Sequence, residues 1–275
     1  LGDSKIALYG DSMGQFGSIT LQSLTRDPGA TVTFNTITAA PYGNSTTGRV
    51  YITATPTLTN GIIGGWAVAG TRDVPLFATY GPDGVVPIST YQTQLTTAAP
   101  TDNVVLLSSG GTRTLSADLP INSLTLDTFV TTTIDLQGHT LTLSSGGYLA
   151  EGTDPAIITN GTFTAGTPGT GGELFVHTLR EQAQISANIT DNAGGQVSLV
   201  KSGDFGLELS GANTYTGPTY ANEGTLLIDT VTALPANNVL KVNGATVNFT
   251  LADPSATFQL GALELRQNGL VYGVV

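Results

Sequence analysis

Short segments in which apolar and polar residues alternate recur along the whole chain. Most of them are separated by turn-forming dipeptides such as Gly146-Gly147 and Asn243-Gly244, which accept the backbone angles of tight turns. The pattern predicts strands at residues 19–24, 31–34, 104–107, 124–126, 133–136, 140–143, 157–163, 197–200, 206–209, 225–228, 239–242 and 263–265. Because the best helical candidate, residues 174–183, lacks both a cap and a 3.6-residue apolar stripe, we expect almost no helix.

Repeating strand–turn units without helices are compatible with a sandwich, a propeller or a solenoid. The units here are short and irregular in length, and the segment GATVTF at residues 29–34 returns as GATVNF at residues 244–249. Such repeats favour a solenoid, whose turns tolerate insertions. The sequence therefore predicts an all-β fold, a right-handed parallel β-helix or β-solenoid, forming a single domain over residues 1–275. Residues 56–95 interrupt the pattern, either as a loop excursion or as a transition between two solenoid segments.

The charge balance and the absence of cysteine exclude several classes of function. The chain has 20 acidic and 9 basic residues, a formal net charge of −11, which repels phosphate backbones, so we expect no nucleic-acid partner. It has no cysteine, which excludes thiolate catalysis, zinc–cysteine sites and disulfides. No run of 18 apolar residues occurs, so we expect no membrane insertion of this segment. Few lysines with abundant Thr, Gly and Asn indicate an exported bacterial protein, and the lack of a signal peptide indicates a processed or excised piece.

Residues 199–226, LVKSGDFGLELSGANTYTGPTYANEGTL, carry the most distinctive motif of the chain. A Lys-x-Gly opening precedes an alternating leucine pair, then Ser-Gly-x-Asn-x-Tyr-x-Gly-x-Thr and a closing Gly-x-Leu. The motif positions are Lys201, Gly203, Leu207, Leu209, Ser210, Gly211, Asn213, Tyr215, Gly217, Thr219, Gly224 and Leu226. This segment resembles the autotransporter-associated β-strand repeat, also called the passenger-associated transport repeat. It departs from that family's pattern at Phe205, where glycine is usual, and at Pro218, which affects the turn rather than the fold.

The resemblance implies one turn of a solenoid in an exported surface protein, in a family that shares no catalytic residues. Asn213 suits a side-chain ladder or an Asx turn, and we expect Tyr215 to cover a corner of the core with its hydroxyl in water. Our interpretation is an extracellular structural or adhesive β-solenoid of the bacterial cell surface. We expect no catalytic residues, no cofactor and no bound metal.

One short block is similar to an enzyme motif. Residues 6–13, Ile-Ala-Leu-Tyr-Gly-Asp-Ser-Met, resemble the nucleophile block of Gly-Asp-Ser lipases and esterases, with Ser12 as the nucleophile. That chemistry needs a histidine paired with a carboxylate. The two histidines, His139 and His177, lie in strand-like segments outside that family's Asp-x-x-His pattern. We therefore interpret this block as a turn between strands.

Carbohydrate chemistry is the alternative function. Several acids are spaced at about the length of a solenoid turn, so that two of them can meet on one face: Asp102, Asp118, Asp127, Asp135 and Glu151. A lyase of this fold also needs a basic residue, and Arg113 is the nearest arginine in sequence, so solvated acidic turns are the favoured interpretation. For binding of surface glycans without cleavage, Trp66, Tyr80 and Tyr91 are the aromatic side chains that would stack on sugars.

Both ends of the chain have the character of open strand edges, which are templates for further pairing. The N-terminus begins with strand-forming residues 5–9, and the C-terminus ends in apolar residues, namely Leu270, Val271, Tyr272, Val274 and Val275. Neither end resembles the polar caps of natural solenoids. We predict self-association through the solenoid ends, with copies stacking end to end into an extracellular fibre.

Overall fold

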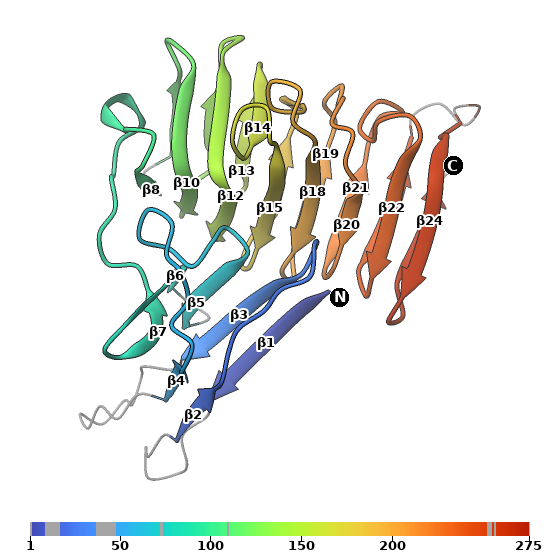
Figure 1. Ribbon diagram of the computed structural model, residues 1–275. Coiled ribbons are helices and arrows are strands. Elements are labelled where there is room, and N and C mark those ends of the chain that lie inside the picture. The colour runs from blue at the N-terminus through green and yellow to red at the C-terminus, as the bar shows by residue number, and fades with distance from the viewer. Residues whose placement is uncertain are drawn as a thin grey trace.

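The computed structural model describes residues 2–8, 17–36, 48–71, 74–108, 110–251, 255 and 257–274. The fold is all-β, a parallel β-solenoid of about 10 turns (Figure 1). The described residues contain no α-helix, and one 3-10 turn, η1, covers Leu95–Thr97. The predicted all-β solenoid is confirmed, whereas its right-handed winding stays a prediction.

The alternating segments of the sequence lie on observed strands. Each of the segments predicted to be a strand overlaps one. The weak helical candidate, residues 174–183, belongs instead to the end of one strand and the start of the next. The two-residue period therefore decides the local structure, because every turn of the solenoid needs one face inside and one outside.

The main solenoid consists of two long sheets that share a core. We call them the front sheet and the back sheet. The front sheet contains β8 (Asn103–Ser108), β10 (Leu119–Thr128), β12 (Thr140–Gly152), β15 (Gly172–Thr178), β18 (Val197–Ser202), β20 (Thr219–Ala221), β22 (Asn238–Asn243) and β24 (Leu260–Arg266), and it extends from β12 through β14 (Thr162–Ala165) to β17 (Asn188–Ile189). The back sheet contains β9 (Gly111–Thr114), β11 (Thr132–Asp135), β13 (Ala156–Thr159), β16 (Ala183–Ile185), β19 (Gly206–Leu209), β21 (Thr225–Ile228), β23 (Thr246–Thr250) and β25 (Leu270–Val274). All strand pairs in both sheets are parallel.

Side chains on alternate positions form columns that run along the inside of the solenoid. One inward column of the front sheet joins Leu124, Tyr148, Val176, Lys201, Ala221 and Val242 by strand register. All six side chains are fully buried, and all but Lys201 are apolar or aromatic. Because neighbouring strands are about 4.8 Å apart, each inward side chain packs on the equivalent one in the next turn.

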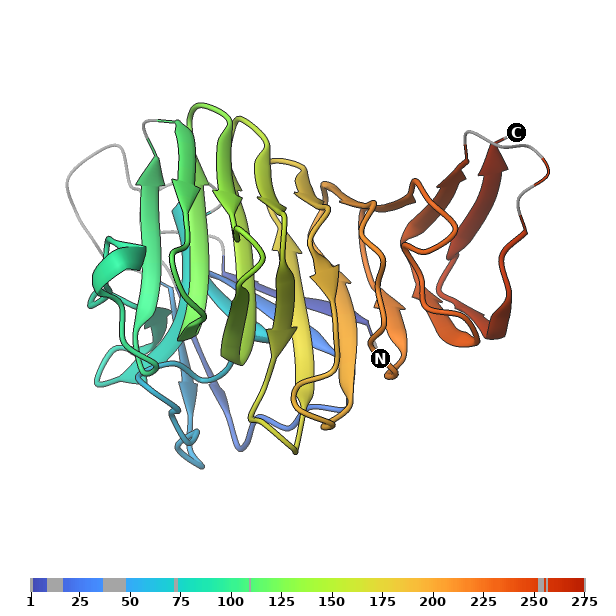
Figure 2. The same cartoon turned by 90° about the horizontal axis from the view of Figure 1, so that it is seen from above.

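The two ends of the main solenoid differ. At β8, residues 92–101 lie over the core, with Leu95 packed against it and Gln92 paired with Val104. At the other end, Leu263 and Leu265 of β24 continue the inward register but are 45% and 54% exposed, since no further turn covers them. Figure 2 shows this last turn at the end of the solenoid farthest from β8.

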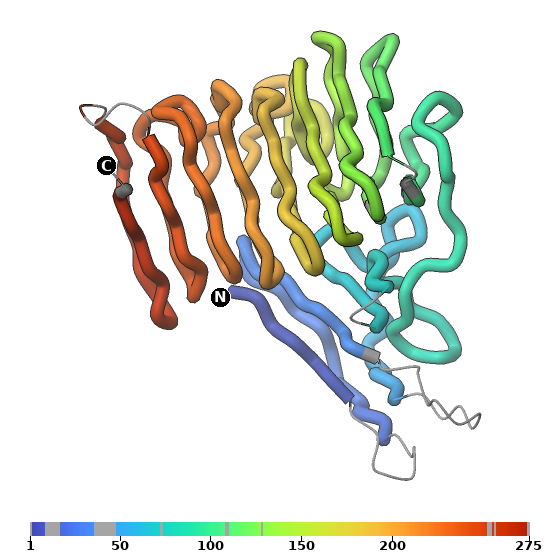
Figure 3. Tube along the Cα trace, turned by 180° about the vertical axis from the view of Figure 1, so that it is seen from behind, coloured from blue at the N-terminus to red at the C-terminus, as the bar shows by residue number. Residues whose placement is uncertain are grey.

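The first part of the chain forms a second, smaller layer, which we call the N-terminal layer (the described residues between 2 and 91). Its strands β1 (Asp3–Leu8), β3 (Thr31–Thr36) and β5 (Ala67–Thr71) pair in parallel, and β6 (Val74–Gly81) and β7 (Gly84–Pro87) extend this sheet in antiparallel fashion. β2 (Ser18–Leu21) pairs with β4 (Arg49–Ile52). Residues 56–95, which interrupt the sequence pattern, thus contain β5, β6, β7 and the start of η1. Figures 1 and 3 show the N-terminus beside the C-terminal half of the main solenoid, where Gly2 lies close to Asn243 and Gln267.

The buried leucines of the repeat motif test the assignment of inside and outside. Leu207 and Leu226 are neighbours in register and fully buried. Leu207→Ala and Leu226→Ala should each lower the free energy of unfolding by about 2–5 kcal/mol, because each leaves a cavity in a packed core. Urea denaturation measures this loss. Val231→Ala, at a site that is 45% exposed, is the control and should cost much less. A near-zero loss at both leucines would mean that they do not face the core.

Candidate functional site

The junction between the N-terminal layer and the front sheet is a second buried interface. Phe175, Val200 and Tyr220 occupy one outward column of the front sheet, and Trp66 packs against them. Next to this column, Leu149 packs in an apolar cluster with side chains of the N-terminal layer. The N-terminal layer therefore covers this part of the outer face of the front sheet and shields it from solvent.

Glycines let the two layers approach closely at the centre of the junction. A Cβ atom on Gly65 would lie 2.4 Å from the backbone nitrogen of Gly147. A Cβ atom on Gly147 would lie 2.7 Å from the ring of Phe77. Both distances are too short for non-bonded atoms, so a larger residue at either position would force the layers apart.

A polar clamp fastens β1 to the turns that follow β18 and β20. Lys5 Nζ lies 2.9 Å from Asp204 Oδ1 and 2.7 Å from Glu223 Oε1. Asp3 Oδ1 accepts a hydrogen bond from Ser202 Oγ at 2.9 Å. Charged groups are thus paired across the junction, as the cost of removing them from water requires.

Lys201, the lysine of the repeat motif, lies fully buried beneath this clamp. Its Nζ donates to the carbonyl oxygens of Ser202, Gly203 and Glu223 at 3.0, 2.7 and 2.8 Å, which match the three donors of an ammonium group. Burial lowers the pKa of Lys201 to about 7. Burial and a hydrogen bond with Asp204 raise the pKa of the Glu223 carboxyl to about 7. The junction therefore contains two groups that titrate near neutral pH.

His177 is also fully buried in the junction. Its Nε2 donates to the carbonyl oxygen of Gly65 at 2.8 Å, and its Nδ1 has no hydrogen-bond partner among the described residues. The ring of Phe77 stands edge-on to it, with ring centroids 6.3 Å apart. Burial lowers the pKa of His177. Within the part of the chain that the structure describes, the ring is packed against Phe77 and hydrogen-bonded only to the backbone.

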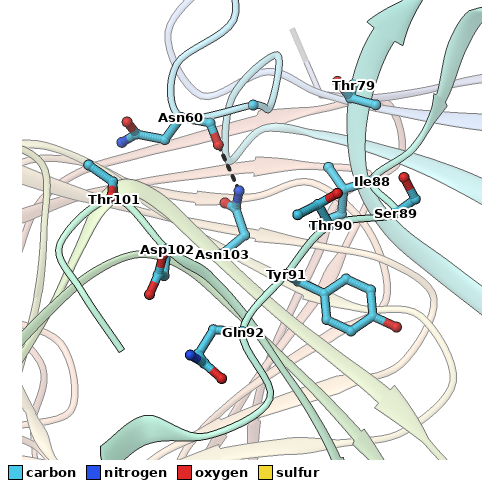
Figure 4. Close-up of a pocket in the computed structure, with 11 residues that line it drawn as sticks. Asn60, Thr79, Ile88, Ser89, Thr90, Tyr91, Gln92, Thr101, Asp102 and Asn103 are labelled. Atoms are coloured by element: carbon cyan, nitrogen blue, oxygen red, sulfur yellow. Dashed lines mark hydrogen bonds between the residues drawn. The ribbon is translucent and has the colours of Figure 1, made fainter. Parts of the chain in front are cut away.

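Two clefts open along the edge of this junction. The larger, which we call the Tyr91 cleft, has a volume of about 520 Å³ and is lined by Asn60, Gly61, Thr79, Ile88, Ser89, Thr90, Tyr91, Gln92, Thr101, Asp102 and Asn103. Figure 4 shows Asn60 and Asp102 on one side of it and Thr79 and Tyr91 on the other, with Asn103 between them. Asn103 Nδ2 donates to the backbone oxygen of Asn60 at 2.7 Å. The lining is dominated by amides and hydroxyls.

The second cleft, which we call the Trp66 cleft, has a volume of about 310 Å³. Its lining includes Arg26, Thr59, Ile63, Gly64, Gly65, Trp66, Ser144, Ser145, Gly166, Thr167, Gly171, Gly172, Glu173 and Phe175. The Arg26 guanidinium lies over the rings of Trp66 and Phe175, 5.6 and 5.2 Å from their centroids, and forms an ion pair with Glu173. Cation–π contact and ion pairing together hold this side chain in place.

The three aromatic residues singled out from the sequence do not converge on one site. Trp66 and Tyr91 line different clefts. The Tyr80 hydroxyl bonds the backbone of Ile52, donating to its oxygen at 2.8 Å and accepting from its nitrogen at 2.9 Å, so Tyr80 holds the N-terminal layer together.

Two of the five acids do lie on neighbouring turns. Asp127 and Glu151 are partners in register, and Arg180, which the sequence pattern did not point to, lies 3.2 Å from Glu151. Burial raises the pKa of Asp127, and the charge of Arg180 opposes this shift. Arg113 lies instead on the exposed strand β9.

The remaining three acids stabilise turns. Asp102 accepts from the backbone nitrogen of Ala99, Asp118 from that of Thr140, and Asp135 from that of Gln137. The spacing of the five acids in the sequence did not distinguish these three from Asp127 and Glu151.

The repeat motif spans more than one turn of the solenoid, since Leu199 is paired with Thr219 and Leu207 with Leu226 on the following turn. Asn213 Oδ1 accepts from Ile189 of the preceding turn and its Nδ2 donates to Ala233 of the following turn, both at 2.7 Å, which is a ladder contact. The expectation of a hydrated Tyr215 hydroxyl is wrong: Tyr215 is fully buried and its hydroxyl bonds Thr219 Oγ1 at 2.7 Å.

Glycines of the motif lie where turns meet closely or where φ is positive. Gly203 and Gly224 have φ of 87° and 66°. A Cβ atom on Gly211 would lie 2.4 Å from Ala187 O, and one on Gly217 would lie 2.4 Å from Val197 O.

Other sequence features give no assembled site in the described part of the chain. Of the esterase-like block, residues 6–8 belong to β1, and residues 9–13, with Ser12, lie outside the described residues. His139 is partly exposed, 3.6 Å from Asp118, while His177 is buried in the junction. Among the described residues no group of three or more His, Cys, Asp or Glu side chains could hold a metal ion, and no helix is long and apolar enough to cross a membrane.

No family model, no curated protein and no solved structure matches the chain. The likeness of residues 199–226 to the autotransporter-associated repeat thus rests on the motif residues themselves. The β-solenoid fold is compatible with this likeness.

Glu223 provides a pH test of the clamp. Its pKa in the folded protein, about 7, is above the ordinary value of 4.5, so the folded state binds more protons than the unfolded state between these values. The contribution of Glu223 to stability is therefore fully present below pH 4.5 and is lost as the pH rises through 7. We expect the difference in unfolding free energy, wild type minus Glu223→Gln, to fall across this window in urea denaturation.

The opposite slope that the lowered pKa of His177 produces is common to both proteins and cancels in the difference. The lowered pKa of Lys201, to which the charge of Glu223 contributes, changes stability only above about pH 7, outside this window. A difference that does not change with pH would show that the Glu223 carboxyl does not titrate in this window.

Proposed function

We propose that the chain is part of an extracellular structural or adhesive rod of a bacterial surface. The observation that carries this proposal is the inward column of side chains that continues from turn to turn through the main solenoid. Such a core lets a molecule become longer by adding turns, because the inward side chains of each turn are buried by the neighbouring turns alone. The motif of residues 199–226 supports export to a cell surface, because the repeat that it resembles belongs to surface proteins.

The last turn is the surface through which we propose that copies associate. Leu263 and Leu265 continue the core register without a covering turn, and Leu270 and Tyr272 of β25 are also about half exposed. Uncovered strands of this kind pair with further strands. At the opposite end, residues 92–101 cover the core at β8. In a head-to-tail fibre the last turn of one copy would meet this segment of the next copy. In a tail-to-tail pair the last turns of two copies would meet each other instead.

Deletion of residues 270–275 tests the association. Removing β25 takes away half of the open turn, so the truncated chain should be monomeric where the intact chain forms dimers or fibres. Size-exclusion chromatography with light scattering and negative-stain imaging distinguish a monomer, a closed pair and an open fibre. An intact chain that stays monomeric at high concentration contradicts the proposal.

A matched pair of substitutions separates association from folding. Leu240 and Leu263 are partners in register on adjacent turns, but Leu240 is fully buried and Leu263 is 45% exposed. Leu240→Ala should lower the free energy of unfolding by about 2–5 kcal/mol, and Leu263→Ala should mainly weaken association.

A further inference from the structure

The Tyr91 cleft and the Trp66 cleft are joined by a buried amide cluster. Asn122, which is fully buried, donates from Nδ2 to Asn103 Oδ1 at 2.7 Å and accepts at its Oδ1 from Asn60 Nδ2 at 3.0 Å. The same oxygen accepts from Ser144 Oγ at 3.2 Å. Asn60 and Asn103 line the Tyr91 cleft and Ser144 lines the Trp66 cleft. Although Asn60 is itself exposed, these hydrogen bonds to the buried Asn122 fix the two clefts relative to each other.

The clefts follow the axis of the solenoid. Asn103, Asn122 and Ser144 lie at equivalent corners of three successive turns, and Glu173 lies near the same corner of the fourth. With about 4.8 Å between turns, the two clefts, which we call together the groove, span roughly 14 Å along this axis. This length suits an extended chain rather than a single small molecule.

Polar groups that line the groove are free to bind a ligand. Gln92 uses Oε1 to accept from backbone nitrogens and Asp102 uses Oδ2 in the same way, which leaves Gln92 Nε2 and Asp102 Oδ1 without a partner among the described residues. The hydroxyls of Thr79, Ser89, Thr90, Tyr91 and Thr101 and the indole N–H of Trp66 likewise form no hydrogen bond within the described structure. Hydroxyl groups both donate and accept, so this set matches a ligand that does the same.

The charge of the groove selects against an anionic ligand. Its charged side chains are Asp102, Arg26 and Glu173, and Arg26 is already paired with Glu173. The whole chain carries a net charge of −11, which repels acidic polymers at long range. Strand edges or apolar grooves are the usual peptide sites, and the one edge strand that contributes to the described lining, β8, is already bridged there by Gln92.

We propose that this groove binds a neutral oligosaccharide chain, with Tyr91 and Trp66 as the aromatic contacts at its two parts and the free amides and hydroxyls as hydrogen-bond partners. The site belongs to one copy of the chain, so it does not depend on association through the last turn.

The single tryptophan of the chain, Trp66, makes the test direct. Titrating the whole chain with cellohexaose, maltohexaose or mannohexaose should change its tryptophan emission with saturation at micromolar to millimolar concentrations for at least one of them. Calorimetry on the same samples gives the affinity independently. Hexagalacturonate, the anionic probe, and an extended neutral peptide should bind at least about tenfold more weakly, a difference of 1.4 kcal/mol.

Substitutions that fill the clefts locate the site. Thr101→Phe fills the Tyr91 cleft and Thr59→Phe fills the Trp66 cleft, both at exposed positions that leave the core intact. Each should weaken binding by about tenfold or more, whereas Thr112→Phe, on the exposed strand β9, should not. Asp102→Asn, which keeps the shape of the side chain, is a second test should a phenylalanine variant unfold, and thermal melting checks each fold.

Three results would overturn the proposal. These are the absence of binding to every neutral probe by both methods, tighter binding of hexagalacturonate or the peptide, and equal weakening by Thr112→Phe and the cleft variants.

Discussion

The parallel stacking of turns is the constraint on which the rest of the structure depends. Strands about 4.8 Å apart bring equivalent side chains of successive turns into contact, so an inward position must hold a residue that packs on its own neighbours. Leu124 and Tyr148 meet this condition with apolar surface. Lys201 meets it differently, because its ammonium group turns to three backbone carbonyls at the corner of the turn. Removing this lysine would leave three buried acceptors without a donor, which is why a charged residue is tolerated in the column.

The N-terminal layer turns the outer face of the front sheet into a second interior. The column of Phe175, Val200 and Tyr220 would otherwise be an exposed apolar stripe, and Trp66 covers it. Burial on both faces disfavours charged side chains, and it lowers the pKa of His177 there. The two clefts lie at the edge of this covering and are lined by residues of both the N-terminal layer and the main solenoid.

Local pattern was enough to predict the strands and the inward leucines, because alternation over a few residues decides both. Leu207, Leu209 and Leu226 are buried, and the turns around them hold glycine. The junction could not be predicted in this way. Lys5 meets Asp204 across 199 positions of sequence, and no local period records such a contact. Tyr215 was misjudged for a related reason, because its hydroxyl finds Thr219 only once the chain has turned the corner.

Most basic side chains are used in contacts within the fold, and this limits the charge of the ligands that the surface can attract. Within the described residues, most of these side chains are committed to structural contacts: Lys5 and Arg26 in the junction, Arg180 beside Glu151, and Lys241 and Arg266 both with Glu264. Lys201 is buried altogether. The acids outnumber the bases by 20 to 9, so after this pairing the surface is left with an excess of carboxylates. A molecule of this kind attracts no anionic polymer by charge, so the recognition that we propose for the two clefts has to rest on hydrogen bonds and aromatic faces.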